Sequence, residues 1–234
     1  MKNFILCKNC NTQNPFYGLI CSNCKSYMRE RIFNIDLWNI LGLLIENPQE
    51  AFKKIIFSEH KNFLTFLILL TAGKLLIDSM FISLVTHKTE PFFGKILFDY
   101  FVILSWIIIL IIIISILFRV VHRLFKYETR IKDNAAVLVY SMAPHVFGLV
   151  ILYLIELIVF GADLFSNNPS PFSLKEFLAY TLTGFEALLV LWGVFLSIIG
   201  IYTQTKSTIY SIIAGLFFNS LLAYGLFVSS SILF

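Results

Sequence analysis

Residues 101–118 have the sequence FVILSWIIILIIIISILF, which contains no charged side chain. An α-helix needs about 20 apolar residues to cross about 30 Å of hydrocarbon, and the surrounding stretch Leu97–Phe118 meets that length. The many β-branched residues would also suit a buried strand, but hydrocarbon leaves the polar groups of an open strand edge without partners. The stretch therefore predicts a membrane-spanning helix.

Four further stretches are as long and almost as apolar: Asn62–Val85, Ala135–Phe160, Leu178–Tyr202 and Ile209–Phe234. The first of these lies too far into the chain for a cleaved signal peptide. Over all 234 residues, 58% are hydrophobic and 14% are charged, whereas soluble domains have about 45–50% and about 25%. This composition excludes an ordinary soluble enzyme and a disordered chain. The expected fold class is an all-α membrane protein with five transmembrane helices.

The lysines and arginines predict the orientation of these spans, because cytoplasmic loops carry an excess of both residues. Of the 18 lysines and arginines, 14 fall on the side of the N-terminus. Lys88, Lys95 and Lys175 fall on the other side, and Lys74 lies within the first span. We therefore expect a multi-pass protein of the cell (plasma or inner) membrane, with its N-terminus in the cytoplasm and its C-terminus outside.

All four cysteines lie near the N-terminus, as two C-x-x-C pairs: Cys7, Cys10, Cys21 and Cys24. This spacing is typical of a closed structural Zn²⁺ site with four thiolate ligands. A segment this short buries too little apolar area to fold unaided, so metal binding would drive its folding. Two disulfides or redox-active pairs are the alternative. A cytoplasmic location disfavours disulfides, and no βαβ pattern surrounds either pair. We predict a zinc ribbon over residues 1–28.

Between the ribbon and the spans, residues 29–61 predict two short helices. Asp36 can cap the first, and Asn47 with Glu50 forms a capping box around Pro48 at the start of the second. Amphipathic helices of this kind lie in the cytoplasmic membrane interface with Trp38 at headgroup depth, or they pack under the bundle. The predicted domains are thus a ribbon (1–28), an interfacial linker (29–61) and a transmembrane domain (62–234).

Ionisable side chains within spans are costly and indicate function by default. The candidate intramembrane polar site comprises Lys74, Asp78, His145, Glu156 and Glu186. One interpretation is a polar cavity, open outward, that binds a cation or relays protons through the carboxylates. The other is structural: Lys74 pairs with Asp78 or Glu186, and Asp99 and Glu156 reach the headgroups. For His145, beside a kink at Pro144, we expect a hydrogen bond across helices.

No catalytic motif of a known hydrolase, zinc protease or nucleotide-binding enzyme occurs, so we expect no enzymatic activity and no catalytic residue. The basic loop 119–132 follows from membrane topology, and nucleic-acid binding is not needed to explain it.

Three segments carry a resemblance to a known family: LLIENPQEAFKKI (43–55), YSMAPHVFGLVI (140–151) and LWGVFLSIIGI (191–201). Together with about five spans they resemble the Yip1 domain, and a short four-cysteine ribbon before such a domain resembles its prokaryotic arrangement. In eukaryotes the resemblance implies Golgi and endoplasmic-reticulum membrane proteins that associate with small Rab GTPases and with each other. The DLYGP-like block of those members is missing here, so the resemblance implies architecture and membrane placement more than a GTPase partner.

These observations favour a non-enzymatic, Yip1-like membrane-organising or docking protein whose zinc ribbon binds a protein partner in the cytoplasm. A small transporter or channel that uses the outer-half carboxylates is the alternative, and a lipid-organising role for the linker helices is a third hypothesis. The expected partners are the lipid bilayer and a protein; self-association into a homo-oligomer stays open.

Overall fold

The computed structural model describes residues 3–87 and 93–234. Lys2 and Lys88, which entered the orientation argument, lie outside the described residues. Within the described part, five helical segments are long and apolar enough to cross a membrane: Leu64–Thr86, Ile96–Leu124, Ile131–Phe165, Glu176–Thr205 and Thr208–Ile232. The predicted all-α, five-span membrane fold is confirmed.

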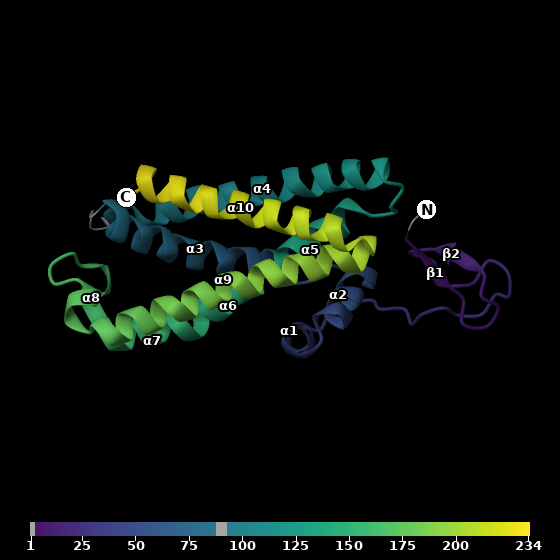
Figure 1. The fold of residues 1–234 in the computed structure, drawn as a ribbon, viewed down its shortest axis with the longest axis horizontal. Helices are drawn as coiled ribbons and strands as arrows, with labels where there is room; N and C mark the ends of the chain where they lie inside the picture. Colours follow the sequence, from purple (N-terminus) through teal and green to yellow (C-terminus); the bar gives the residue numbers. More distant parts are fainter. Residues whose placement is uncertain (1–2, 88–92) are drawn as a thin grey trace. The chain divides into compact units, whose positions relative to one another are not determined.

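The elements follow one another along the chain as drawn in Figure 1. They are β1 (Phe4–Leu6), β2 (Gln13–Pro15), α1 (Leu37–Glu46), α2 (Pro48–Phe57), α3 (Leu64–His87), the 3₁₀ turn η1 (Phe93–Lys95), α4 (Ile96–Leu124), α5 (Ile131–Ser141), α6 (Ala143–Phe147), the π-helical segment η2 (Gly148–Leu152), α7 (Tyr153–Phe160), the 3₁₀ turn η3 (Gly161–Phe165), α8 (Pro171–Leu174), α9 (Glu176–Thr205) and α10 (Thr208–Ile232). Two compact units emerge from the internal contacts. Unit 1 comprises Met1–Leu64, Ile111–Tyr140 and Leu196–Gly215, and unit 2 comprises Thr65–Leu110, Ser141–Phe195 and Leu216–Phe234.

The third span is not the single helix that its apolar stretch suggests. It consists of α5, α6, η2 and α7 in succession, and Met142 separates the first two. Pro144, in the first turn of α6, has no N–H to donate to the preceding turn. The interruption therefore falls beside the proline, where the sequence predicts a kink.

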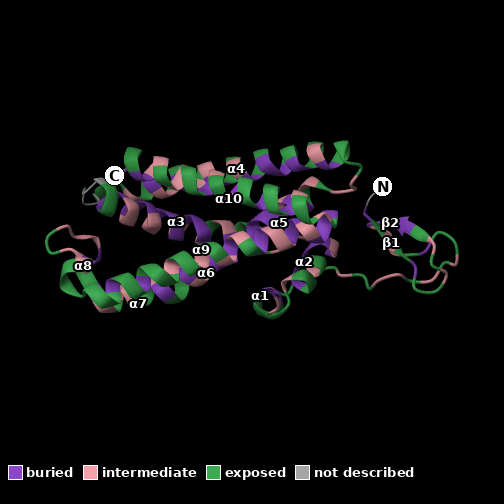
Figure 2. Cartoon of the chain, in the orientation of Figure 1, coloured by how far each residue is buried: buried purple, intermediate pink, exposed green. Residues whose placement is uncertain are grey.

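In unit 1, the two linker helices have different surroundings. Asp36 and Asn47 cap α1 and α2 as predicted, by accepting the backbone N–H of the third residue beyond each cap. The apolar face of α2, Ala51, Phe52, Ile55 and Ile56, is completely or almost completely buried (Figure 2). On α1, in contrast, Trp38 is 82% exposed. Thus α2 packs within its unit, and α1 keeps the exposed aromatic side chain that an interfacial helix needs.

In unit 2, polar contacts join α3 to α4, α9 and α10. The Tyr100 hydroxyl on α4 donates to the Leu69 carbonyl (3.1 Å), and the hydroxyls of Ser79 and Ser229 on α10 are 2.7 Å apart. An ion pair described below joins α3 to α9. The remaining faces of these helices are apolar and exposed, as the green stretches in Figure 2 show. Such large exposed apolar surfaces are expected where lipid chains cover the protein.

Candidate functional site

The four cysteines converge, with all four Sγ atoms within 4.8 Å of one another. The distances Cys7 Sγ–Cys24 Sγ and Cys10 Sγ–Cys21 Sγ are both 3.5 Å, and all four thiols are free. Tetrahedral coordination with metal–sulfur bonds of about 2.3 Å places the sulfurs about 3.8 Å apart. The cluster therefore has the dimensions and the donor set of a four-thiolate metal site.

The two C-x-x-C turns have the same local backbone structure. The N–H of Asn11 donates to the Cys7 carbonyl (2.9 Å), and that of Lys25 donates to the Cys21 carbonyl (3.2 Å). Asn11 and Lys25, each directly after the second cysteine of its pair, have positive φ angles of 54° and 60°. The left-handed residue reverses the chain tightly, so each pair turns both of its thiols inward.

Hydrogen-bond donors around the sulfurs favour their ionised form. The Ser26 hydroxyl lies 3.3 Å from Cys7 Sγ and 2.9 Å from Cys24 Sγ. This hydroxyl, followed by the backbone N–H groups of Asn9 and Cys10, lowers the pKa of the Cys7 thiol to about 6. Thiolates are the form that binds metals. A metal bound here would cross-link the two turns, and with four protein ligands it would have no open coordination position.

Polar contacts join the ribbon to the other segments of unit 1. Asn3 exchanges two hydrogen bonds with the backbone of Glu128 (2.8 and 2.9 Å), and its side-chain amide also donates to the Gln204 carbonyl (3.1 Å). The Arg130 guanidinium lies 4.1 Å from the centre of the Tyr17 ring. These contacts hold the ribbon against the loop that precedes α5 and against the last turn of α9.

A buried ion pair lies next to this contact. The Lys61 ammonium is 2.8 Å from Asp133 Oδ1, and the two side chains are only 7% and 3% exposed. Lys61 also donates to the carbonyls of Ile56 and Ser58 (2.9 and 3.0 Å). Burial lowers the pKa of Lys61, and the charge of Asp133 opposes this effect. Sequence reasoning missed the pair, because it assigned both charges to membrane topology alone.

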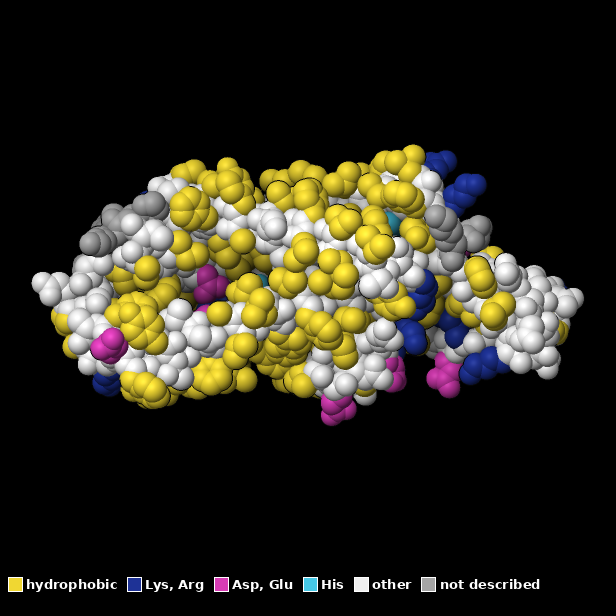
Figure 3. Space-filling model, in the orientation of Figure 1, with side chains coloured by type: hydrophobic (Ala, Val, Ile, Leu, Met, Phe, Trp, Pro, Cys, Tyr) yellow, Lys and Arg dark blue, Asp and Glu magenta, His cyan; other side chains and the backbone are white. Residues whose placement is uncertain are grey.

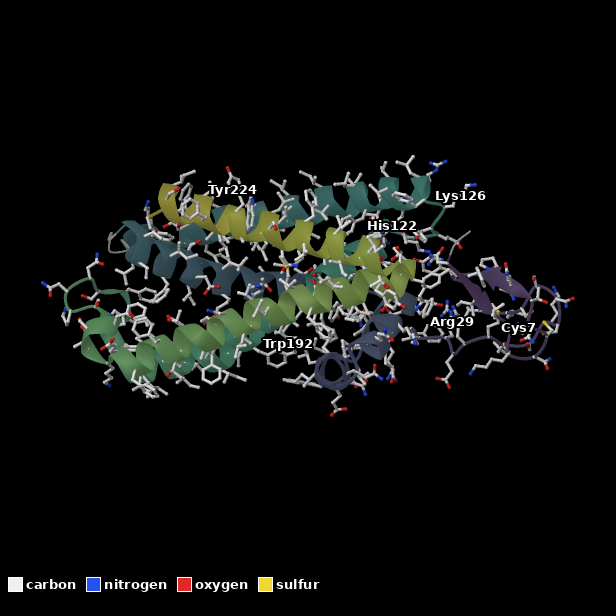
Figure 4. The ribbon with its side chains drawn as sticks, in the orientation of Figure 1. Cys7, Arg29, His122, Lys126, Trp192 and Tyr224 are labelled. Atoms are coloured by element: carbon white, nitrogen blue, oxygen red, sulfur yellow. The ribbon has the colours of Figure 1, made fainter. Side chains whose placement is uncertain are left out.

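The same carboxylate influences Tyr17. Burial, and next to it the negative charge of Asp133, raise the pKa of the Tyr17 hydroxyl. The Arg29 side chain, labelled in Figure 4, donates to the Tyr17 carbonyl (3.1 Å) and lies 4.4 Å from the centre of the Phe57 ring. Ribbon, linker and the first turn of α5 thus share one buried cluster within unit 1.

The second candidate site lies in unit 2 at membrane depth. The Lys74 ammonium on α3 is 2.5 Å from Asp78 Oδ1, one turn further along the same helix, and 2.6 Å from Glu186 Oε1 on α9. Sequence reasoning offered these two carboxylates as alternative partners, and the structure shows both at once. The Lys74 stem passes over Gly148, where a Cβ would lie 2.9 Å from Lys74 Cε.

A cavity of about 250 Å³ opens beside this ion triad and brings all five predicted intramembrane residues together. Its polar lining is Lys74, Asp78, His145, Glu156, Thr183 and Glu186, and its apolar lining includes Ile77, Phe81, Ile82, Leu164, Phe165, Val190 and Leu226. In Figure 3, acidic side chains are visible in a hollow of the apolar surface.

Three polar residues have surroundings that differ from those expected: His145, Asp99 and Glu156. His145 is 7% exposed and lines the cavity, and within the described ranges its ring has no hydrogen-bond partner. Asp99 is fully buried and does not reach the surface. Glu156, expected at the headgroups, lines the cavity, and no described residue binds its carboxylate.

The fold and the two sites define a multi-pass helical membrane protein. A cluster of four cysteines that can bind a metal ion precedes its spans. The family model described as "Yip1 domain" matches residues 41–232, from α1 to the end of α10. The chain therefore belongs to the Yip1 domain family. Searches of curated proteins and of solved structures found no match.

Proposed function

We propose that this Yip1 domain protein is a non-enzymatic docking protein of the cell membrane, with its N-terminus in the cytoplasm and its ribbon bound to Zn²⁺. The observation that carries the proposal is the convergence of four thiols in a ribbon that Asn3 and Tyr17 fasten to the other segments of unit 1. A metal-stabilised head, fixed in place, presents a defined surface to a partner at little entropic cost.

Exposed apolar side chains on the ribbon support a protein as the partner. Tyr27, Leu6 and Ile20 are 81%, 53% and 49% exposed. Apolar and aromatic side chains of this kind form the centres of protein–protein interfaces. The lysine and arginine distribution supports the cytoplasmic side, where a protein partner and reduced thiols are both available.

Proximity labelling in cells tests the docking proposal. The full chain should lose its labelled partners in the double variant Leu6→Ser/Tyr27→Ser, which leaves the cysteines intact, and in Cys10→Ser, which removes a ligand. The control Lys8→Gln changes an exposed ribbon residue and should keep both metal and partners. Metal analysis of the purified proteins should give close to one Zn²⁺ per wild-type chain. A metal content near zero, or an unchanged partner set in both variants, would refute the proposal.

A second candidate function is transport of a cation through the intramembrane site, and the cavity beside Asp78, Glu156 and Glu186 supports it. Carboxylates at low dielectric bind cations or protons strongly. Proteoliposomes with the wild-type protein should then show a cation or proton flux that Glu186→Gln and Asp78→Asn abolish at full expression. Absence of any flux from the wild-type protein would eliminate this candidate and leave the docking proposal untouched.

A further inference from the structure

The cavity in unit 2 contains more carboxyl groups than its lysine can pair with. Three carboxylates line it, from α3, α7 and α9, and Lys74 is bound to two of them, Asp78 and Glu186. Glu156, the third, has no partner among the described residues. A charge in hydrocarbon without a partner is costly, so the third carboxylate calls for a cation or a proton.

His145 provides an independent observation. Its side chain is more than nine-tenths buried, it lines the cavity, and no hydrogen bond to it occurs within the described part of the chain. A buried imidazole without a partner loses about 1–3 kcal/mol of hydrogen-bonding free energy. Its neutral form offers one acceptor and one donor to whatever enters the cavity.

The rest of the wall favours an organic ligand over a metal ion. A hard metal cation needs about six oxygen ligands at close range, but two of the three carboxylates, Asp78 and Glu186, are paired with Lys74, and the Thr183 hydroxyl donates to its own helix (2.9 Å). The walls between these groups are aliphatic and aromatic, with Phe81 and Phe165 among them. Aromatic faces bind ammonium groups, and aliphatic walls bind a hydrocarbon body.

The size of the cavity limits the ligand. At about 250 Å³, it lies just below the range of about 300–1,000 Å³ that is typical of pockets for drug-sized molecules. A bare ion would leave most of this space empty, whereas a primary amine with a single aromatic ring or a short alkyl chain would fill it. The ammonium of such a molecule has the same chemistry as the Lys74 head that the site already binds.

We propose that this cavity binds a small primary organic ammonium ion with an apolar body, its ammonium donating to Glu156 and to His145. The inference deepens the second candidate function by naming a ligand class, but binding does not require transport. A free amine and the ethanolamine headgroup of a lipid share this chemistry.

The test uses the full-length, metal-loaded protein in nanodiscs of phosphatidylglycerol, which has no ammonium group. Phenethylammonium is the probe, 2-phenylethanol is its neutral counterpart, and binding is measured by calorimetry. We expect saturable binding of the amine, binding of the alcohol that is at least about tenfold weaker, and no competition by Na⁺. Glu156→Gln should weaken amine binding about 10- to 100-fold, as expected for the loss of a charged hydrogen-bond partner. The matched control Glu176→Gln, in the exposed first turn of α9, should bind like wild type.

Two outcomes with the wild-type protein would overturn the proposal: equal binding of amine and alcohol, or displacement of the amine by Na⁺. Wild-type affinity for the amine in the variant Glu156→Gln would also overturn it. A nanodisc that also contains phosphatidylethanolamine identifies the source: competition with the probe indicates the lipid headgroup, and unchanged affinity indicates a free amine. Binding without flux would remove the transport candidate and keep this inference, whereas flux without amine binding would do the reverse.

Discussion

Unit 1 and unit 2 each contain a lysine bonded to carboxylate in a buried setting, and the two arrangements differ in how completely the charges are matched. Lys61 faces one carboxylate, Asp133, and turns its remaining donors to backbone carbonyls. Lys74 is shared by two carboxylates, and a third lines the adjoining cavity without a partner. The first pair is balanced and closed, but the second set has spare charge beside open space.

This difference separates a structural ion pair from a binding site. A pair that is balanced in charge stabilises one packing arrangement. Spare carboxylate next to a cavity costs stability in the free protein, and a cation can recover that cost on binding. The comparison therefore predicts different responses when either lysine is removed.

The largest effect is expected from Lys61→Met. The substitution keeps the aliphatic stem but leaves the Asp133 carboxylate buried and unpaired, which should lower the free energy of unfolding by about 3–5 kcal/mol. Denaturant titration of the purified protein measures this loss. The double variant Lys61→Met/Asp133→Leu removes both charges and should recover most of it. A double variant as unstable as the single one would show that the pair is not the cause.

Lys74→Met should lower the free energy of unfolding by less than Lys61→Met does, about 1–3 kcal/mol. The same denaturant titration measures this loss. The side chains of Asp78 and Glu186 are 20% and 24% exposed toward the cavity, so water or a proton can relieve their repulsion. A loss equal to that of Lys61→Met would contradict the distinction between the closed and the open site.

Two glycines refine the comparison at a smaller scale. A Cβ at Gly200 would lie 2.6 Å from Val137 Cγ1 and 3.0 Å from the Phe52 ring. Overpacking of this kind costs about 1–3 kcal/mol, so Gly200→Ala should lower the melting temperature. A Cβ at Gly148 would lie 2.9 Å from Lys74 Cε and 3.1 Å from Leu189 Cδ1, a looser fit than at Gly200. Both positions are helical and gain about 1 kcal/mol from alanine, so Gly148→Ala should lower the melting temperature less than Gly200→Ala. The opposite ranking in thermal unfolding would contradict this interpretation.

The smallest effect is expected at the exposed pair Arg31–Glu59, whose charged atoms are 2.6 Å apart. Hydrogen bonding to Arg31 lowers the pKa of Glu59. A lowered pKa in the folded state means that the pair stabilises above the ordinary pKa of glutamate and that this contribution is lost as pH falls through the lowered value. Glu59→Gln should therefore change the melting temperature only marginally at neutral pH. The difference should shrink as the pH falls through the lowered pKa; a larger difference in acid would refute it.

The sequence was sufficient to predict the spans and the cysteine cluster, because apolar length and C-x-x-C spacing are local signals. It also predicted an ion pair between Lys74 and Asp78, since residues four apart in a helix share a face. It could not predict the pairing of Lys61 with Asp133, because segments far apart in sequence meet only through tertiary packing. Nor could it predict the burial of Asp99, since a charge at a span end has the same pattern whether it faces protein or headgroups.

The position of Lys74 has a mechanical consequence. The aliphatic part of the Lys74 side chain packs over Gly148 on the third span. Its ammonium group binds Asp78 on the first span and Glu186 on the fourth. A slide of α9 along α3 by one turn, about 5.4 Å, would separate Glu186 from Lys74 and leave the Glu186 carboxylate without its partner, while Lys74 would keep Asp78. One side chain thus fixes the axial register of three helices, so that they can tilt together but cannot slip past one another.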